Sequence, residues 1–341
     1  MCASYPARPL PTPESEVLVV EPELSGIRLH DLLARSWPEV RLADLRQLVS
    51  SGEVSVNGEE CVSDRRLRVG DVVLVQAAPK GRGNPATSRR QEAGPLTVLH
   101  ETDTALVVAK PAGTPSVPAR HGGERGVHGQ LQDLRPDEDL RIVHRLDRNT
   151  SGCLVLAKGL EASRHFDAAF RERRVQKTYL ALVEGVPHQD TFPIDAWLGP
   201  DRRRPGMVVA SPEQKKGFRE AHTDVEVRRR FRRHALLALH PTTGRGHQLR
   251  VHLLSVGHPI VADEDYGGER LLLSRLKPDY RQRKGVEERP LLNRMFLHAE
   301  RVRLRDVDGS DLDVEAPLPE DLSVVLRHVE KHASARRPHC D

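Results

Sequence analysis

The chain has 341 residues, of which 38% are hydrophobic and 30% are charged, a composition typical of a folded globular protein with room for more than one domain. Its 53 lysines and arginines nearly balance 49 aspartates and glutamates, so any affinity for nucleic acid must come from local clusters of basic side chains. The four cysteines lie far apart with no C-x-x-C pair, so neither a disulfide framework nor a zinc ribbon is indicated, and no stretch approaches the about twenty apolar residues of a membrane span. We therefore expect a cytoplasmic protein without a membrane segment.

The first part of the chain predicts a small domain between two segments without regular structure. Residues 1–16 are rich in proline and are expected to be disordered. Within residues 17–78, a short strand is followed by two runs of leucines at helical spacing and then by an alternating pattern with an Asn57-Gly58 turn. Residues 79–95 have the glycine, proline, serine and charge content of a basic, flexible linker.

A second and larger domain is expected over residues 96–332, with a disordered tail over 333–341. It begins with two strands, and the stretch 118–139 is interpreted as loop. Residues 140–159 then read as strand, polar loop and strand, with Asp147 in a stiff turn that ends in Thr-Ser-Gly. An isolated loop aspartate most often only caps a turn, but the whole string around Asp147 is unusual.

Three further patterns follow this loop. Residues 160–175 predict an amphipathic helix, and residues 177–185 predict a strand that carries Tyr179. A lone tyrosine in a strand is usually a core residue with a wet hydroxyl. In residues 240–253, the letters HPTTG predict a turn, and the following GHQLRVHL predicts a helix on which His247 and Arg250 lie a turn apart.

Arginine runs and histidines allow other readings. The runs at 201–205 and 228–233 are either a solvated face or contacts for an RNA backbone, and residues 269–294 form a basic insertion. The histidines show no metal-ligand spacing, so we expect neither a metal nor a cofactor.

Three sequence motifs in this second domain together resemble the RluA family of RNA pseudouridine synthases. The string His-Arg-Leu-Asp-x-x-Thr-Ser-Gly over 144–152, the Lys-Thr-Tyr-Leu-Ala context of Tyr179 and the string Gly-Arg-x-His-Gln-x-Arg-x-His-Leu over 244–253 carry the resemblance. Members of the family often have threonine or serine where this chain has Gly246. The resemblance implies an α/β (α+β) fold with a mixed, largely antiparallel sheet and a central cleft, and a reaction that needs no cofactor.

The resemblance also implies roles for individual residues. Asp147 would be the catalytic residue, Arg250 would pair with it through a two-pronged contact, and Tyr179 would lie beside the uracil. Arg145 would fill the space that a flipped-out uridine leaves. Further residues are expected to bind the RNA: His144, Arg148, Thr150, Arg245, His247 and Gln248.

The N-terminal domain resembles the ribosomal protein S4-type RNA-binding domain, with Arg41 and Arg46 on its basic helical face. The expected partner is structured RNA, with large-subunit ribosomal RNA favoured and transfer RNA as the alternative, and a monomer is the simplest assembly. Two other classes of protein are alternatives. A non-catalytic RNA-binding or ribosome-assembly protein on the same fold would be indicated by the loss of Asp147 or Arg250, and both are present; a metal-dependent hydrolase would be excluded by activity that is insensitive to chelators.

Overall fold

The computed structural model describes residues 16–37, 40, 42–76, 96–117, 126–277, 279–281 and 287–333. It divides into two compact units, Met1–Arg90 and Gln91–Asp341, each of which is described by itself. The expected linker, the two expected tails apart from Glu16 and Ala333, and the expected RNA contact Arg41 lie outside the described residues.

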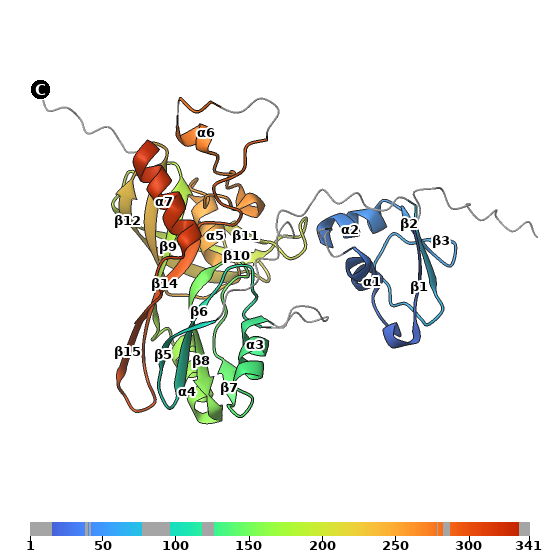
Figure 1. Ribbon diagram of the computed structural model, residues 1–341, viewed down its shortest axis with the longest axis horizontal. Coiled ribbons are helices and arrows are strands. Elements are labelled where there is room, and N and C mark those ends of the chain that lie inside the picture. The colour runs from blue at the N-terminus through green and yellow to red at the C-terminus, as the bar shows by residue number, and fades with distance from the viewer. Residues whose placement is uncertain are drawn as a thin grey trace, which may run out of the picture. The chain divides into compact units, whose positions relative to one another are not determined.

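The first unit is a four-stranded antiparallel sheet with two helices (Figure 1). Its elements are β1 (Glu16–Val19), the short 3-10 helix η1 (Pro22–Leu24), α1 (Leu29–Ser36), α2 (Leu42–Ser50), β2 (Val54–Val56), β3 (Glu59–Glu60) and β4 (Val72–Val75). The expected turn forms at Asn57 and Gly58, whose φ angles are 54° and 85°, because this tight turn requires left-handed backbone at both positions. The leucines of α1 and the valines of β2 and β4 form the core.

The second unit is built on a sheet of eleven strands within the described part of the chain, in the order β11-β10-β12-β13-β9-β14-β8-β6-β5, with β15 beside β14 and β7 beside β8. The strands are β5 (Thr97–Glu101), β6 (Ala105–Lys110), β7 (Leu140–Ile142), β8 (Ser151–Lys158), β9 (Gln176–Glu184), β10 (Thr191–Pro200), β11 (Val208–Ser211), β12 (Arg219–Arg230), β13 (His234–Pro241), β14 (Leu297–Arg305) and β15 (Asp311–Glu315). Each strand pair is antiparallel except the short parallel pair of β14 and β8. The predicted mixed, largely antiparallel sheet is therefore confirmed.

The second unit also contains helices, and the alternating side chains of its strands make the two faces of the sheet different. The helices are α3 (Gly126–Leu134), α4 (Gly159–Arg171), α5 (Gln248–Ser255), η2 (Glu264–Tyr266), α6 (Leu273–Leu276) and α7 (Glu320–Ala333). On β12, Thr223 and Val225 are buried while Asp224 between them is exposed, because successive side chains of a strand point to opposite faces. The buried face packs against α5, where His252 Nδ1 lies 3.0 Å from Thr223 Oγ1. The other face of β12 carries polar and charged side chains.

The loop interpretation of residues 118–139 is wrong in part, because α3 occupies Gly126–Leu134. Its glycines weaken the helical signal in the sequence. Val127 and Leu131, one turn apart, are both buried against β6 and β8, so tertiary packing stabilises the helix.

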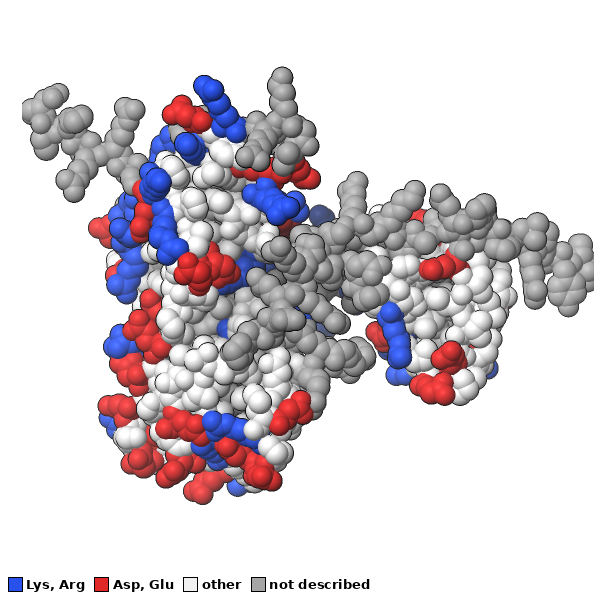
Figure 2. Space-filling view, viewed as in Figure 1, with Lys and Arg blue, Asp and Glu red and all other residues white. Residues whose placement is uncertain are grey.

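Charge is distributed unevenly on the surface. In the view of Figure 2, acidic side chains gather over the end of the second unit that carries β5, β7 and β8, and basic side chains are more frequent over α7 and β12. This is the clustering that an almost neutral chain needs for nucleic-acid affinity. None of the helices in the described ranges is long and apolar enough to cross a membrane.

Candidate active site

The loop between β7 and β8 is held from both sides by buried polar side chains. Ser116 Oγ donates to the carbonyl of Leu146 over 3.1 Å and accepts the Leu146 N–H over 3.0 Å. The ammonium of Lys110, which is only 1% exposed, donates to three carbonyls, one of them that of Arg148 over 3.0 Å. Since these two anchors flank Asp147 in the chain, its backbone position is fixed independently of any substrate.

A second set of bonds ties the end of this loop to the far side of the sheet. The guanidinium of Arg294 forms a two-pronged ion pair with Asp321 of α7, at 2.6 and 3.0 Å, and its Nη2 also donates to Ser151 Oγ over 3.2 Å. Ser151 Oγ lies 2.9 Å from Nδ1 of His298, whose Nε2 lies 3.1 Å from the carbonyl of Ala316. The start of β8 is thus bonded to β14 and α7 through buried groups.

The fixed loop forms one wall of a cavity of about 680 Å³. The opposite walls come from the start of β9, the turn after β13 and the start of α5. Eight of the twelve expected site residues line this cavity: His144, Arg145, Asp147, Thr150, Tyr179, Arg245, His247 and Gln248. The exposed Arg148 and the buried Arg250 are not part of the lining. Arg46 belongs to the first unit, where it is exposed on α2.

Asp147 is half-buried in this cavity, and its carboxylate has no hydrogen-bond or ion-pair partner among the described residues. Its main-chain carbonyl accepts the N–H of the buried Thr150 over 3.0 Å, which closes the turn. A carboxylate that is fixed but unpaired is available to a bound substrate.

Tyr179 lies on β9 between β13 and β14, where it pairs with Leu239 and Ala299. Burial raises the pKa of its phenol, and the charge of Asp147 raises it further, since both disfavour a phenolate. The hydroxyl of Tyr179 is therefore protonated at neutral pH.

The expected two-pronged contact of Arg250 with Asp147 is not formed. Arg250 binds Asp263 instead, through Nε at 2.7 Å and Nη2 at 2.6 Å. Burial would lower the pKa of Arg250, but the bond with Asp263 and the charges of Asp263, Asp147 and Asp265 outweigh burial and raise it. Because Nε and Nη2 of Arg250 both bind Asp263, Asp147 forms no ion pair with Arg250. The charge of the fixed guanidinium still acts on Asp147.

His247 precedes α5 and does not lie on it, which corrects the prediction of a helix that carries both His247 and Arg250. Its backbone is left-handed, with a φ of 54°, and α5 begins at Gln248. The hydroxyl of Tyr266 accepts the N–H of Val208 over 3.0 Å and also lies 2.7 Å from Nδ1 of His247. Burial lowers the pKa of His247, which favours the neutral ring.

Gln248 lines the cavity, but its amide is fully used within the protein. Its Oε1 accepts from the hydroxyl of Thr243 at 2.7 Å and from the N–H of Arg245 at 3.0 Å. Its Nε2 donates to the carbonyl of His222 at 2.9 Å and to Thr223 Oγ1 at 3.0 Å. Gln248 therefore supports the turn that carries Arg245, and an RNA contact through its amide would require one of these bonds to break.

His144 also has a supporting contact. Its Nε2 accepts the N–H of Val155 over 2.9 Å, and its ring stacks on Phe170 at 4.6 Å between centroids. Burial and the nearby charge of Lys177 lower the pKa of His144 to about 3, so the ring is neutral. Arg145, next to it, is exposed and lines the cavity.

Sequence reasoning missed four residues of the site: Lys177, Asp263, Tyr266 and Arg294. Asp263 and Tyr266 belong to the string Val-Ala-Asp-Glu-Asp-Tyr-Gly-Gly, whose acidic residues were a signal for an arginine partner. The ring of Tyr266 also lies 4.5 Å below the guanidinium of Arg250. Lys177 is the first residue of the Lys-Thr-Tyr-Leu-Ala string around Tyr179, and nothing in the sequence indicated its burial.

Comparisons with known proteins agree with this architecture. Residues 104–255 match the family model of RNA pseudouridylate synthase. The chain is 32% identical over 322 residues to ribosomal large subunit pseudouridine synthase C of Vibrio vulnificus, which covers 92% of this chain and 96% of that protein. It is 33% identical over 325 residues to the synthase C of Escherichia coli, covering 93% and 97%, and 33% identical over 334 residues to synthase D of Nitrosomonas europaea, covering 94% and 90%.

Two solved human structures are similar as well. They are the RNA pseudouridylate synthase domain-containing proteins 4 and 1. The first has a TM-score of 0.55 at 26% identity and covers 69% of this chain and 93% of that chain; the second has a TM-score of 0.52 at 29% identity and covers 66% and 84%. Fold and matches place the chain among the pseudouridine synthases, a class of isomerases that act on RNA. Within that class it belongs to the RluA family.

Proposed function

We propose that this chain converts uridine to pseudouridine in large-subunit ribosomal RNA and that Asp147 is its catalytic residue. The observation that carries the proposal is the unpaired carboxylate of Asp147, held in the cavity by a loop whose backbone is anchored on both sides. The relatives from Vibrio vulnificus and Escherichia coli, which are named for the ribosomal large subunit, support this RNA. Transfer RNA is the alternative target.

The reaction moves one bond within a nucleotide. The bond from N1 of uracil to C1′ of the ribose breaks, the base rotates, and a bond from C5 to C1′ forms; C5 loses its proton and N1 gains one. Substrate and product are isomers, so the balance needs no oxidant and no water. The site must supply a nucleophile or charge stabiliser, hold the detached base and move the C5 proton.

Each group around the cavity fits one of these tasks. Asp147 attacks the ribose or the ring, or stabilises the sugar cation. Tyr179, protonated and beside Asp147, packs against the uracil and takes part in the final proton transfer. Arg250 acts on Asp147 through its positive charge, while Asp263 fixes the guanidinium.

The uridine must leave its helix to enter the cavity, which costs a few kcal/mol that contacts in the site offset. Arg145 is exposed at the cavity and takes the place of the flipped nucleotide. The first unit, with two helices and a small sheet, serves as an S4-type domain that contacts a second part of the RNA, with Arg46 on the exposed side of α2. We place the activity in the cytoplasm, on a monomer.

Pseudouridine mapping by carbodiimide-based sequencing tests the proposal. Total RNA is compared from cells with the intact gene, with a deletion, and with the deletion rescued by the wild type, Asp147→Asn or Asp139→Asn. Asp139 is a matched control because it is exposed and its carboxylate bonds only Arg141, at 2.9 Å, within the described residues. We expect sites in large-subunit ribosomal RNA that the wild type and Asp139→Asn restore and Asp147→Asn does not.

Other results would change the proposal in defined ways. Pseudouridine sites found only in transfer RNA would mean that transfer RNA is the target. Rescue by Asp147→Asn would remove its catalytic role, and an unchanged map in every RNA would favour a binding protein on the same fold.

A further inference from the structure

A second cavity, of about 430 Å³, adjoins the catalytic one. The two share Arg173, Lys177, Pro241 and Thr242 in their walls. The second cavity, named here the side groove, lies on the polar face of the sheet. Its other lining residues are Val175, Gln176, Thr178, Asp224, Arg228, His240, Arg301 and Arg303. Anything that extends from the catalytic cavity past Lys177 enters this groove.

Basic side chains dominate the side groove, which has five lysines and arginines against one carboxylate, Asp224. Arg301 and Arg303 are partly neutralised, since both bind Asp313, with nitrogen-to-oxygen distances of 2.6 to 2.9 Å. Arg228 lies 3.4 Å from a carboxylate oxygen of Glu226. The remaining two cations, Arg173 and Lys177, have no acidic partner among the described residues, and they are the two at the junction with the catalytic cavity.

The position of Lys177 at this junction disfavours its charged form. Its side chain is half-buried, and burial lowers the pKa of its ammonium to about 8. At neutral pH it is nevertheless charged, and no counter-charge within the described ranges neutralises it. Neither burial nor packing explains a lysine at this position, since an apolar side chain of the same length would fill it better.

Arg173 shows an independent sign of constraint. It follows α4 with a φ of 60°, a left-handed backbone that costs an arginine about 1 kcal/mol and that glycine or asparagine adopts more readily. The turn nevertheless carries an arginine whose side chain lines both cavities. Arg173 and Lys177 thus both line the junction of the two cavities, each at a position that is energetically unfavourable for it.

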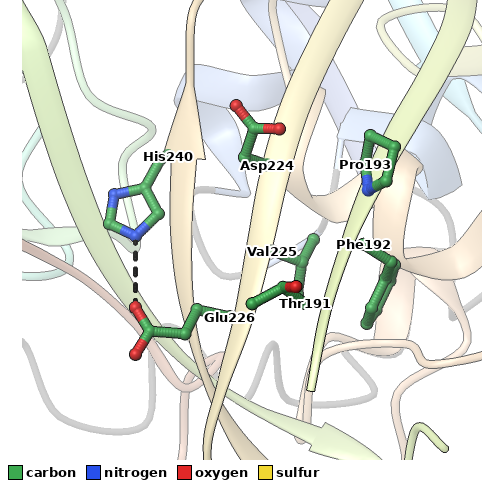
Figure 3. A pocket seen from close by; sticks show the side chains of 7 residues that line it. All are labelled: Thr191, Phe192, Pro193, Asp224, Val225, Glu226 and His240. Atoms are coloured by element: carbon green, nitrogen blue, oxygen red, sulfur yellow. Dashed lines mark ion pairs between the residues drawn. The ribbon is translucent and has the colours of Figure 1, made fainter. Parts of the chain in front are cut away.

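The far end of the side groove is acidic. There Asp224 and His240 are shared with a third pocket, of about 310 Å³, whose residues come from β10, β12 and β13 (Figure 3). In that pocket His240 is paired with Glu226 at 3.8 Å, and Asp224 stands on the neighbouring strand. A polyanion is therefore attracted at the catalytic end of the groove and repelled at the other, so the attractive stretch is short.

We propose that Lys177 and Arg173 form a subsite for a backbone phosphate of the RNA strand that carries the target uridine. The phosphodiester lies in the mouth of the side groove while the base occupies the catalytic cavity. The subsite positions the nucleotide, and Lys177 is a binding residue that takes no part in bond breaking. This inference rests on the proposed function only in taking RNA as the substrate.

The first test is the salt dependence of binding to a twelve-nucleotide polyuridine strand. Each phosphate contact to a single strand contributes about 0.7 to the slope of log K against log salt concentration, so Lys177→Met should lower the slope by about that amount. Arg173→Asn, which keeps a residue suited to the left-handed backbone, should do the same. Lys177→Arg should retain the slope, and so should the control Arg305→Gln, whose residue lies on β14 outside the groove.

The second test uses the shortest ribosomal RNA fragment that the wild type modifies. Lys177→Met should raise KM about tenfold or more, the range of a charge-assisted hydrogen bond, with kcat within about twofold. In a series of fragments with one uncharged methylphosphonate linkage each, one linkage next to the target should weaken wild-type binding and have no further effect on Lys177→Met.

The outcomes separate the two proposals. A fall in kcat at unchanged KM, additive effects of Lys177→Met and the sensitive linkage, or an unchanged salt slope would overturn the phosphate subsite. If the wild type modifies no RNA, the proposed function fails, and the salt slope on polyuridine still decides whether Lys177 and Arg173 bind a phosphate.

Discussion

At the scale of single residues, the acidic partner of Arg250 fixes the guanidinium whose charge acts on Asp147. Arg250 has two acidic partners, and only Asp263 is buried with it; the side chain of Asp265 is 68% exposed and lies 3.1 Å from Nη2. Removing one member of a buried pair costs about 3–5 kcal/mol, whereas an exposed partner contributes about 1 kcal/mol or less. The two aspartates therefore make a matched pair of substitutions around one arginine.

We predict that Asp263→Asn lowers kcat at least tenfold and destabilises the second unit by about 3 kcal/mol, because the guanidinium loses its buried counter-charge and its orientation. Asp265→Asn should change both by little. Urea unfolding and steady-state kinetics on one RNA measure the two effects. Equal behaviour of the two variants would mean that Asp263 does not position Arg250.

Replacing Lys177 is predicted to increase stability although it weakens RNA binding. Its pKa is about 8 in the folded chain and 10.5 in the ordinary state, so the unfolded chain holds its proton more tightly. The cost is complete below pH 8 and disappears as the pH rises from 8 to about 10.5. Lys177→Met should therefore stabilise the chain at pH 7, by about 1–3 kcal/mol after allowance for its partial exposure, and the gain should shrink toward pH 10.

Thermal unfolding of the wild type and of Lys177→Met at pH 7 and pH 9.5 measures this gain. The groups that face the lysine are His144, Arg173, His240 and the arginines of β12 and β14. Burial lowers the pKa of His144 to about 3, so this ring stays neutral across the pH window in which Lys177 changes charge. A variant less stable than the wild type at both pH values would show that the lysine is there for packing.

Sequence patterns predicted which residues lie together better than they predicted the contacts of each residue. Asp147, Tyr179 and His247 line one cavity as the motifs predicted, because each motif lies where a strand or helix begins or ends at the same edge of the sheet. Pairing is set by geometry across the fold. The motifs could not show that Asp263 takes the fork of Arg250 or that Gln248 has no free hydrogen-bonding position.

At the scale of elements, the position of the loop that carries Asp147 depends on how closely β8 approaches β14. Gly152 has a φ of 117°, and a Cβ at this position would collide with the backbone of Ala299 on β14. The parallel pair of the two strands is short and includes this residue. A glycine at the end of the motif is thus required by packing as well as by the turn.

We predict that Gly152→Ala destabilises the second unit by about 3 kcal/mol or more and lowers activity, since the start of β8 must move away from β14. Gly246→Ala is the control for stability, because nothing lies within 4 Å of its Cβ position. Chemical unfolding of both variants measures the difference. Equal unfolding free energies would show that the loop tolerates a shift of β8.

Elements with a clear period were predicted from the sequence, and elements stabilised mainly by their neighbours were not. The strands on either side of Asp147 and the helix α4 were expected, because alternation and helical spacing are strong in them. The glycines of α3 hid a helix that buries Val127 and Leu131. The network around Arg294 joins residues more than 140 positions apart, which no local pattern reveals.

At the scale of the whole molecule, the proposed catalytic groups belong to the second unit, and the first unit has a core of its own. The core of the first unit is formed by leucines and valines of α1, α2, β2 and β4, and the cavity around Asp147 is lined by residues of the second unit alone. Separate cores make separate folding plausible on physical grounds. Chemistry and choice of RNA can therefore be tested separately.

We predict that a chain starting at Gln91 folds and retains kcat on the shortest RNA fragment that the full chain modifies, within about threefold, because every residue that lines the cavity is present. On intact ribosomal RNA its KM should rise tenfold or more, since the contacts of the first unit are lost. Arg46→Gln in the full chain is the graded comparison: it removes one exposed cation of α2 and should lower the salt slope of binding while leaving kcat unchanged. A truncated chain that unfolds cooperatively but is inactive on every RNA, the short fragment included, would mean that the first unit helps to build the active site.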